Sequence, residues 1–308
     1  MERGTVIKST GSRYTVRLEN GSLVSCMIKG KFRTHGIRAT NPVAVGDHVH
    51  INLADNGLTG VITAIEERSN YIIRRASNLS REYQILAANI NIAWLMVSMV
   101  LPRTLTAFID RFLVSAEAYR IPVTLLFNKI DLYNDQEMEE MEELLGIYRQ
   151  IGYRCMLLSL ETGEGVEIVK EEMKGKVNVI AGNSGVGKSM LIKRLDPSVN
   201  LKIGEISDAH GAGRHTTTFS EMFEITGGIR IIDTPGIRGF GTIDIDQSEL
   251  FHFFPEIFRA SSDCRYHNCM HINEPGCNVK QQVVEGSISE SRYLNYLMMM
   301  EGDEGKYR

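Results

Sequence analysis

The sequence has no apolar run long enough to cross a bilayer and no apolar N-terminal signal segment. It also has few cysteines, five in 308 residues, and two of them, Cys26 and Cys155, lie far from the other three. These absences argue against a membrane-spanning protein and against a secreted domain held together by disulfides. We therefore expect a cytoplasmic protein without a membrane partner.

A strong net charge is also absent, since the formal charge is only −4, and we find no internal repeat. The charge is unevenly distributed, however. Residues 1–75 hold eleven Lys and Arg against six Asp and Glu, an excess of +5 that leaves −9 for the remainder. With 43% hydrophobic residues, the chain can bury two or three cores. We expect a basic N-terminal domain joined to acidic ones.

The basic segment has the pattern of a small β-barrel. Short alternating runs at residues 14–18 and 23–28 are separated by turn signals such as Asn20-Gly21 and residues 55–57. We expect an oligonucleotide-binding (OB) barrel over residues 1–75, followed by a polar linker at residues 76–84.

Basic and aromatic side chains of this segment suit phosphate contacts and base stacking, although scattered surface charge explains them nearly as well. The candidates are Lys29, Lys31, Arg33, Arg38, Arg74 and Arg75, with Tyr14, Phe32 and Tyr71.

A phosphate-binding loop is predicted at residues 182–189, which fit the pattern G-x-x-x-x-G-K-[ST]. An apolar run at 177–180 precedes it and a helix-forming run at 190–192 follows it, which is the required strand–loop–helix context. A glycine-rich turn is the alternative. We expect Lys188 to reach the outer phosphates and Ser189 to bind Mg²⁺. The full set is Gly182, Asn183, Ser184, Gly185, Val186, Gly187, Lys188 and Ser189.

A guanine-reading motif is predicted at residues 128–131, Asn-Lys-Ile-Asp, which end the apolar run 123–127. The Asp131 carboxylate can accept two hydrogen bonds from guanine, whereas adenine offers no matching donors. Asn128 would brace the neighbouring loops and the Lys129 stem would lie over the base. A polar turn with Asp131 as a helix cap is the alternative.

The tetrapeptide Asp233-Thr234-Pro235-Gly236 follows a further apolar run at residues 229–232. Asp233 is placed to hold the Mg²⁺ shell, and Gly236 can offer its backbone N–H to the γ-phosphate. The next residue is Ile237, which cannot orient the attacking water as a glutamine would. We therefore expect slow intrinsic hydrolysis, with the missing group supplied elsewhere.

Residues 211–218 are rich in glycine and hydroxyl groups, as expected of a mobile switch. We favour Thr217 as the Mg²⁺ ligand, with Thr216 and Thr218 as alternatives. His215 is the candidate for orienting or deprotonating water, although a lone loop histidine is more often simply solvated. A surface loop with no ligand is the alternative for the whole segment.

The order of these motifs is informative, because the guanine-reading motif precedes the phosphate loop instead of following the Asp233 motif. This order indicates a circularly permuted α/β P-loop GTPase, which we assign to residues 76–245. Within it, apolar residues at helical spacing predict two helices, one from near Leu105 and one after the cap candidates Asn134 and Asp135.

A structural zinc site is predicted in an α-rich module over residues 246–308, in which we expect residues 289–300 to form a helix. Three cysteines and one histidine in a C-x4-C-x-H-x5-C arrangement leave no open coordination position. His267 is an alternative to His271, and a disulfide with a spare thiol is the competing interpretation. The predicted ligands are Cys264, Cys269, His271 and Cys277.

Together these motifs resemble one family, the circularly permuted, ribosome small-subunit-dependent GTPases of bacteria known as RsgA. The resemblance covers nearly the whole chain. It includes the barrel, the phosphate loop and the Cys3His spacing. It also includes residues 108–113, 158–165, 214–218 and the Asp233 motif with its following hydrophobic residue.

The resemblance implies a late factor in 30S subunit maturation that hydrolyses GTP to GDP when the subunit stimulates it. It implies contacts of the barrel and zinc module with 16S rRNA, and it places Ser159 against the guanine. A monomer is the simplest expectation. The alternative function is an RNA-binding assembly module in which GTP is mainly a structural ligand.

Overall fold

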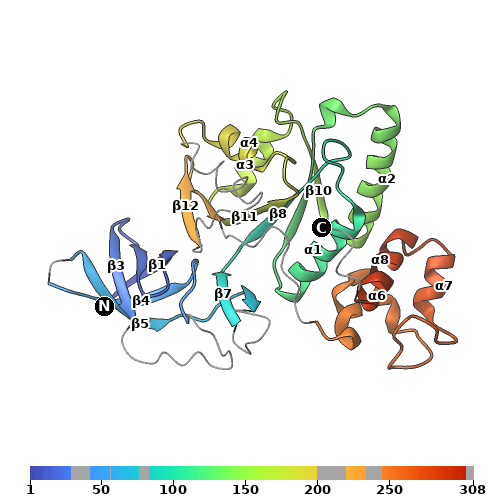
Figure 1. Ribbon diagram of the computed structural model, residues 1–308, viewed down its shortest axis with the longest axis horizontal. Coiled ribbons are helices and arrows are strands. Elements are labelled where there is room, and N and C mark those ends of the chain that lie inside the picture. The colour runs from blue at the N-terminus through green and yellow to red at the C-terminus, as the bar shows by residue number, and fades with distance from the viewer. Residues whose placement is uncertain (29–41, 56, 76–82, 200–219, 234–244, 303–308) are drawn as a thin grey trace.

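The computed structural model describes residues 1–28, 42–55, 57–75, 83–199, 220–233 and 245–302. Figure 1 shows a strand barrel on the left, a central sheet flanked by helices, and a helical part on the right. The predicted three-part architecture is therefore confirmed. None of the described helices has the length and apolar composition that a bilayer crossing needs.

The N-terminal part is a closed five-stranded barrel. Its strands run in the order β1-β2-β3-β5-β4, and β4 returns to pair with β1. Buried and outward residues alternate along the strands, so that Val16, Val24 and Ile62 fill the interior. The strands are β1 (Glu2–Ser9), β2 (Tyr14–Leu18), β3 (Leu23–Ile28), β4 (His48–Leu53) and β5 (Thr59–Ile65).

The expectation that Tyr14 stacks on RNA bases is wrong. Its side chain is only 2% exposed and its hydroxyl donates to the Gly11 carbonyl at 3.3 Å. The strand alternation places position 14 on the inner face, where it fills the barrel core. Tyr71 is half-buried. The other candidates, Lys29, Lys31, Phe32, Arg33 and Arg38 and the side chains of Arg74 and Arg75, lie outside the described residues.

A two-stranded antiparallel sheet follows the barrel, formed by β6 (Tyr71–Arg75) and β7 (Tyr83–Ala88). The boundary expected after residue 75 falls between these two strands. Of the expected linker, residues 76–82 lie outside the described part of the chain, and residues 83 and 84 belong to β7.

The central sheet has the order β10-β9-β8-β11-β13-β12, in which the first five strands are parallel and β12 is antiparallel. Every residue of β8 is buried, as expected for a strand covered on both faces. The strands are β8 (Ile92–Val97), β9 (Val123–Asn128), β10 (Arg154–Leu158), β11 (Val177–Gly182), β12 (Glu221–Ile225) and β13 (Ile229–Asp233).

Helices cover the two faces of this sheet with separate hydrophobic cores. Helices α1 (Thr106–Ala118) and α2 (Asp135–Ile151) pack in one core, and α3 (Val166–Met173) and α4 (Lys188–Leu195) pack in the other. Helix α2 begins where predicted, because the Asn134 side chain accepts the Glu137 N–H at 3.0 Å in a capping box.

The barrel joins the central sheet at one strand edge, through the pairing of β1 with β12 at Lys8 and Glu221. The side chains of these two residues also form an ion pair at 2.8 Å, and Arg17 on β2 pairs with Glu224 on β12. The ion pairs lie beside a short strand pairing, where Ile7 of β1 packs against the central hydrophobic core. Exposed pairs of this kind add little free energy to the folded state.

The C-terminal module is helical, as predicted, and packs on α1 through a core that includes Val114, Phe254 and Tyr296. Its elements are the 3₁₀ helix η2 (Gln247–Phe253), α6 (Pro255–Ser261), α7 (Asn278–Val284) and α8 (Glu290–Met300). The module and the barrel lie on opposite sides of the central sheet in Figure 1.

A buried polar network fastens this module to the central domain. Asp110 on α1 is fully buried and accepts hydrogen bonds from Tyr148 at 2.8 Å, Arg292 at 2.7 Å and Asn295 at 2.6 Å. Arg292, only 1% exposed, also pairs with both oxygens of Glu256 at 2.7 and 3.1 Å. Every charge in this network is hydrogen-bonded, which is the condition for burying charge without a large penalty.

We expect Asp110→Ala to lower the free energy of unfolding by about 3–5 kcal/mol, because Arg292 stays buried with its charge half compensated. The measurement is urea-induced unfolding followed by circular dichroism. The matched control is Arg103→Ala, which removes an exposed ion pair with Glu140 (2.7 Å) and should cost less than about 1 kcal/mol. Equal, small losses in both variants would contradict a fastening role for the network.

Candidate functional site: a nucleotide cavity and a Cys3His cluster

Four parallel strands bring the predicted motifs to one edge of the sheet. β9 ends at Asn128, β10 at Leu158, β11 at Gly182 and β13 at Asp233. The register aligns Asn128 with Leu158, and Gly182 with Met96, the residue before the last one of β8. Because ligands of open α/β sheets bind beyond the carboxyl ends of the strands, this edge is the place for a bound nucleotide.

The loop between β11 and α4 has the glycine conformations expected of a phosphate loop. Gly182, Gly185 and Gly187 have φ angles of 140°, 79° and 118°. A Cβ atom on Gly187 would lie 2.5 Å from the Asn128 amide nitrogen, so only glycine fits there. Lys188 opens α4, and its ammonium donates to the carbonyls of Gly182 at 2.9 Å and Asn183 at 2.7 Å.

The Asn128 side chain, at the end of β9, forms hydrogen bonds with the segments that follow β10 and β11. Its amide nitrogen donates to the Val186 carbonyl in the phosphate loop at 2.8 Å, and its amide oxygen accepts the Leu160 N–H at 3.3 Å. The side chain is buried, so these bonds are not exchanged with water. The structure thus brings the two motifs together through the residue expected to brace the loops.

Lys129 holds the same loop from the other side. It adopts a left-handed backbone conformation with φ of 70°, which is unusual for a residue with a side chain. Its ammonium donates to the carbonyls of Gly185, at 3.0 Å, and Leu101. The lysine therefore contacts the phosphate loop through a charge-assisted hydrogen bond.

Asp131 lies on the short 3₁₀ helix η1 (Ile130–Leu132), where its carboxylate accepts a hydrogen bond from the Ser159 hydroxyl at 2.5 Å. Ser159 is buried and is itself fixed by the Thr162 N–H, which donates to its hydroxyl at 3.1 Å. The serine after β10 therefore orients the carboxylate of the guanine-reading motif.

These groups surround one cavity of about 510 Å³. Its volume lies in the range of small-ligand sites. The lining combines both motifs with the loop after β10 and includes Asn128, Asp131, Leu160, Gly187, Lys188 and Ser189. The sequence did not predict that Leu160 lines the cavity, although Leu160 directly follows the predicted residue Ser159. The Leu101 carbonyl, which accepts a hydrogen bond from Lys129, could not be predicted from sequence, because every residue has a backbone carbonyl.

Several predicted residues cannot be placed in this cavity. His215, Thr217 with its alternatives Thr216 and Thr218, Gly236 and Ile237 all lie outside the described residues. Asp233 is described, and it ends β13 at the same edge as the phosphate loop.

The four predicted metal ligands lie together in the C-terminal module, with all ligand atoms within 4.8 Å of one another. The sulfurs of Cys264 and Cys277 are 4.0 Å apart, and the His271 Nδ1 lies 3.6 and 3.5 Å from them. A disulfide needs about 2.05 Å, whereas two thiolates on one tetrahedral Zn²⁺ lie about 3.8 Å apart. The cluster therefore fits a metal and not a disulfide, and the alternative ligand His267 is exposed outside it.

Burial sets the protonation states of the cluster in the absence of a metal. Burial raises the pKa of Cys269 to about 12 and lowers the pKa of His271, so neutral thiols and a neutral imidazole are favoured without a metal. The buried His271 Nε2 has no hydrogen-bond partner among the described residues. Glu274 shapes the loop by accepting three backbone N–H groups, from Met270, Ile272 and Asn273, at 2.7–3.1 Å.

Comparisons with known proteins agree with this geometry. The family model described as RsgA GTPase matches residues 65–243, and the one described as RsgA N-terminal domain matches residues 3–62. A Bacteroides fragilis (strain YCH46) protein named small ribosomal subunit biogenesis GTPase RsgA is 56% identical over 307 residues, covering 99% of both chains. A protein of that name from Christiangramia forsetii is 51% identical over 308 residues, covering 99% of this chain and 98% of that one.

Two solved structures are similar over nearly their whole length. The crystal structure of YjeQ from Thermotoga maritima superposes with a TM-score of 0.79 at 33% identity and covers 99% of each chain. The structure of YloQ, described as a circularly permuted GTPase, has a TM-score of 0.75 at 30% identity and covers 100% of this chain and 97% of that one. The permuted order of motifs is thus shared with a solved structure.

Proposed function

This chain belongs to the RsgA family of GTPases, and we propose that its hydrolysis of GTP serves maturation of the small (30S) ribosomal subunit. The name shared by its relatives supports the link to the subunit. The main support for GTP binding and hydrolysis is the hydrogen bond from the Asn128 amide to the Val186 carbonyl at 2.8 Å. It joins the guanine-reading motif to the phosphate loop, and both motifs line the same cavity.

In this proposal the guanine base is read by Asp131, whose carboxylate the Ser159 hydroxyl holds in place. Asn128 fixes the loops around the base, and Lys129 joins the base site to the phosphate loop. A carboxylate left without the guanine donors would lose hydrogen bonds worth a few kcal/mol, which is why ATP should be rejected.

The phosphates would be held by backbone N–H groups of the loop at residues 182–189 and by the Lys188 ammonium. Bound Mg²⁺ would neutralise the charge between the outer phosphates, and we assign Ser189, Asp233 and Thr217 as the residues that hold it. Ser189 lines the cavity and Asp233 ends the strand next to β11. Gly236 would donate its N–H to the γ-phosphate.

The group that orients the attacking water is a separate question, because position 237 carries isoleucine. We propose His215 for this role, in a site completed by the small subunit. Slow hydrolysis alone and fast hydrolysis on the subunit follow from such a divided site.

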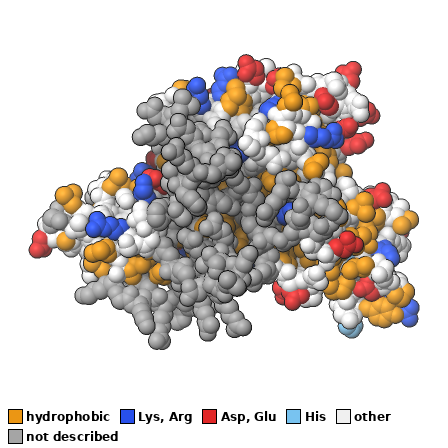
Figure 2. All heavy atoms as spheres, viewed as in Figure 1, with side chains coloured by type: hydrophobic (Ala, Val, Ile, Leu, Met, Phe, Trp, Pro, Cys, Tyr) orange, Lys and Arg blue, Asp and Glu red, His pale blue; other side chains and the backbone are white. Residues whose placement is uncertain are grey.

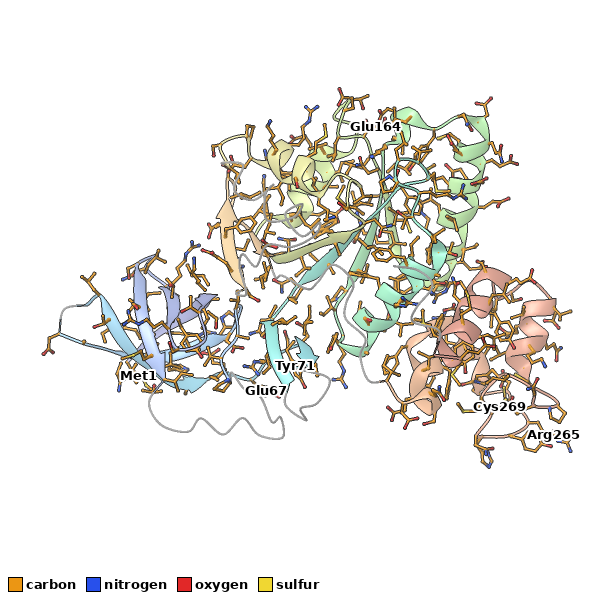
Figure 3. The ribbon with its side chains drawn as sticks, viewed as in Figure 1. Met1, Glu67, Tyr71, Glu164, Arg265 and Cys269 are labelled. Carbon is orange, nitrogen blue, oxygen red and sulfur yellow. The ribbon has the colours of Figure 1, made fainter. Side chains whose placement is uncertain are left out.

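In the C-terminal module we propose one structural Zn²⁺ held by Cys264, Cys269, His271 and Cys277. The distances and the absence of an open position support this assignment. The ion would fix the loop of residues 265–268, whose exposed side chains project from the module near the labelled Arg265 and Cys269 in Figure 3.

We propose that the barrel and the zinc module contact 16S rRNA, with the protein acting as a monomer in the cytoplasm. Figure 2 shows Asp and Glu side chains gathered over α2, where the sequence is DQEMEEMEELLGIYRQI. Phosphate groups would be repelled from that surface. The rRNA would therefore approach other faces of the molecule.

We expect Asp131→Asn to weaken GDP binding at least about tenfold and to strengthen binding of xanthosine diphosphate, whose C2 carbonyl oxygen can accept a hydrogen bond from the new amide. Fluorescence titration measures both affinities. Asp135→Asn, at the exposed start of α2, is the matched control and should bind as the native protein does. An unaltered base preference in Asp131→Asn would remove this residue from the base site.

Removal of one metal ligand should release the zinc. We expect Cys269→Ser to fall well below the one zinc per chain of the native protein, by elemental analysis, and to expose the C-terminal module to proteases. Cys155→Ser, which alters a buried thiol of the central domain, should retain the metal. Full zinc content in Cys269→Ser would refute its assignment as a ligand.

The partner can be tested by sedimentation with purified ribosomal subunits. We expect the protein to pellet with 30S subunits in the presence of a non-hydrolysable GTP analogue, and to pellet less with GDP. The 50S subunit is the control and should not retain it. Equal retention by both subunits would indicate only nonspecific attraction to RNA.

A further inference from the structure

Tyr133 makes two hydrogen bonds beside the guanine-reading motif. Its hydroxyl donates to the backbone carbonyl of Asn128 at 2.7 Å and accepts the backbone N–H of Met99 at 3.0 Å. Tyr133 directly follows η1, so its side chain reaches back across the turn to the residue at which the motif begins. No sequence pattern assigned it a role.

The hydroxyl acts where two neighbouring strands part. The last aligned pair of β8 and β9 is Val97 with Phe127, and Met99 and Asn128 lie just beyond it. The Tyr133 hydroxyl connects the Asn128 carbonyl, just after the pairing of β8 with β9 ends, to the Met99 N–H beyond β8. A ladder hydrogen bond would make this connection if the two strands continued. The strand ends can therefore separate while both buried polar groups stay paired.

The turn that Tyr133 closes holds the guanine-reading motif, including the cavity-lining residues Asn128, Lys129 and Asp131. Within it, Lys129 has the left-handed φ of 70° and Asp131 receives the Ser159 hydroxyl. A non-glycine residue in that conformation costs about 1 kcal/mol or more and persists only where its surroundings hold it. The bond from Tyr133 to Asn128 spans the strained residue and limits the conformations open to the turn.

The chemistry of the hydroxyl suits this task. Burial raises the pKa of Tyr133, so the phenol stays protonated at neutral pH and can donate and accept at once. The ring is partly buried against the core under α1 and α2, and a phenylalanine would preserve that packing. The two roles of the side chain, packing and hydrogen bonding, can therefore be separated by one substitution.

We propose that Tyr133 is a positioning residue for guanine recognition, which holds the turn of residues 128–131 in the conformation that presents Asp131 to the base. This inference rests on the proposed guanine site. It adds a residue that touches neither base nor phosphate and acts through the backbone of Asn128.

The test compares Tyr133→Phe with Tyr153→Phe. The control also loses one partly buried tyrosine hydroxyl, which donates to Glu117 at 2.9 Å outside the nucleotide cavity. Affinities for GDP and for inosine diphosphate, which lacks the exocyclic amine, are measured by titration of the full-length zinc-loaded proteins. Steady-state hydrolysis of GTP supplies KM and kcat.

We expect Tyr133→Phe to weaken GDP binding about five- to tenfold, because the loss of both hydrogen bonds frees the turn and a part of their free energy appears in nucleotide affinity. Its preference for GDP over inosine diphosphate should shrink, because Asp131 is no longer aligned with the amine. KM for GTP should rise while kcat changes less than about twofold. Tyr153→Phe should match the native protein in all four quantities.

Each other outcome is decisive. Equal binding and equal base preference in the two variants would overturn the role of Tyr133 alone. A Tyr133→Phe protein that no longer folds would also overturn it, since the hydroxyl would then serve overall stability. Failure of the native protein to prefer GDP over inosine diphosphate would instead contradict the proposed function of Asp131.

Discussion

The nucleotide cavity depends on one side chain, the Asn128 carboxamide. It joins the end of β9 to the Val186 carbonyl in the phosphate loop and to the Leu160 N–H after β10. Parallel strands place these segments at one edge of the sheet whatever their order along the chain. A permuted order therefore leaves the neighbours in space unchanged, and the amide converts that proximity into a fixed geometry.

A second constraint links the cavity to the C-terminal module through one stretch of chain. The Leu101 carbonyl accepts the Lys129 ammonium beside the phosphate loop, and Asp110, nine residues later, is held by Arg292 and Asn295 of α8. Asp110 lies on α1, which packs against the central core through Phe112 and against the core of the C-terminal module through Val114. The C-terminal module is therefore attached to α1, and the segment that precedes α1 contacts Lys129 beside the nucleotide cavity.

Much of this arrangement could be predicted from sequence, because the signals were local. Apolar runs followed by polar motifs marked the strand ends, the spacing of three cysteines and a histidine marked the Cys3His cluster, and Asn134 marked the start of α2. Each signal depends on residues close together in the chain. The fold class and the two clusters could therefore be predicted without knowing which distant residues are in contact.

The remaining features depend on contacts between distant residues, which local patterns do not specify. Tyr14 was expected on the barrel surface, but strand register places it inside. The pairing of Arg292 with Asp110 joins residues 182 positions apart, and both side chains are buried only because α1 and α8 pack together. Tyr133 looked like an ordinary residue after a turn, since its role depends on where β8 ends.

The most direct test of the whole account is steady-state GTP hydrolysis by the full-length protein, alone and with purified 30S subunits, with 50S subunits as the control. The account predicts slow hydrolysis alone and a large stimulation by 30S subunits only, because Ile237 leaves the water-orienting group incomplete. Tight binding of GTP without stimulation by 30S subunits would contradict it, and would favour an RNA-binding assembly module in which GTP is a structural ligand.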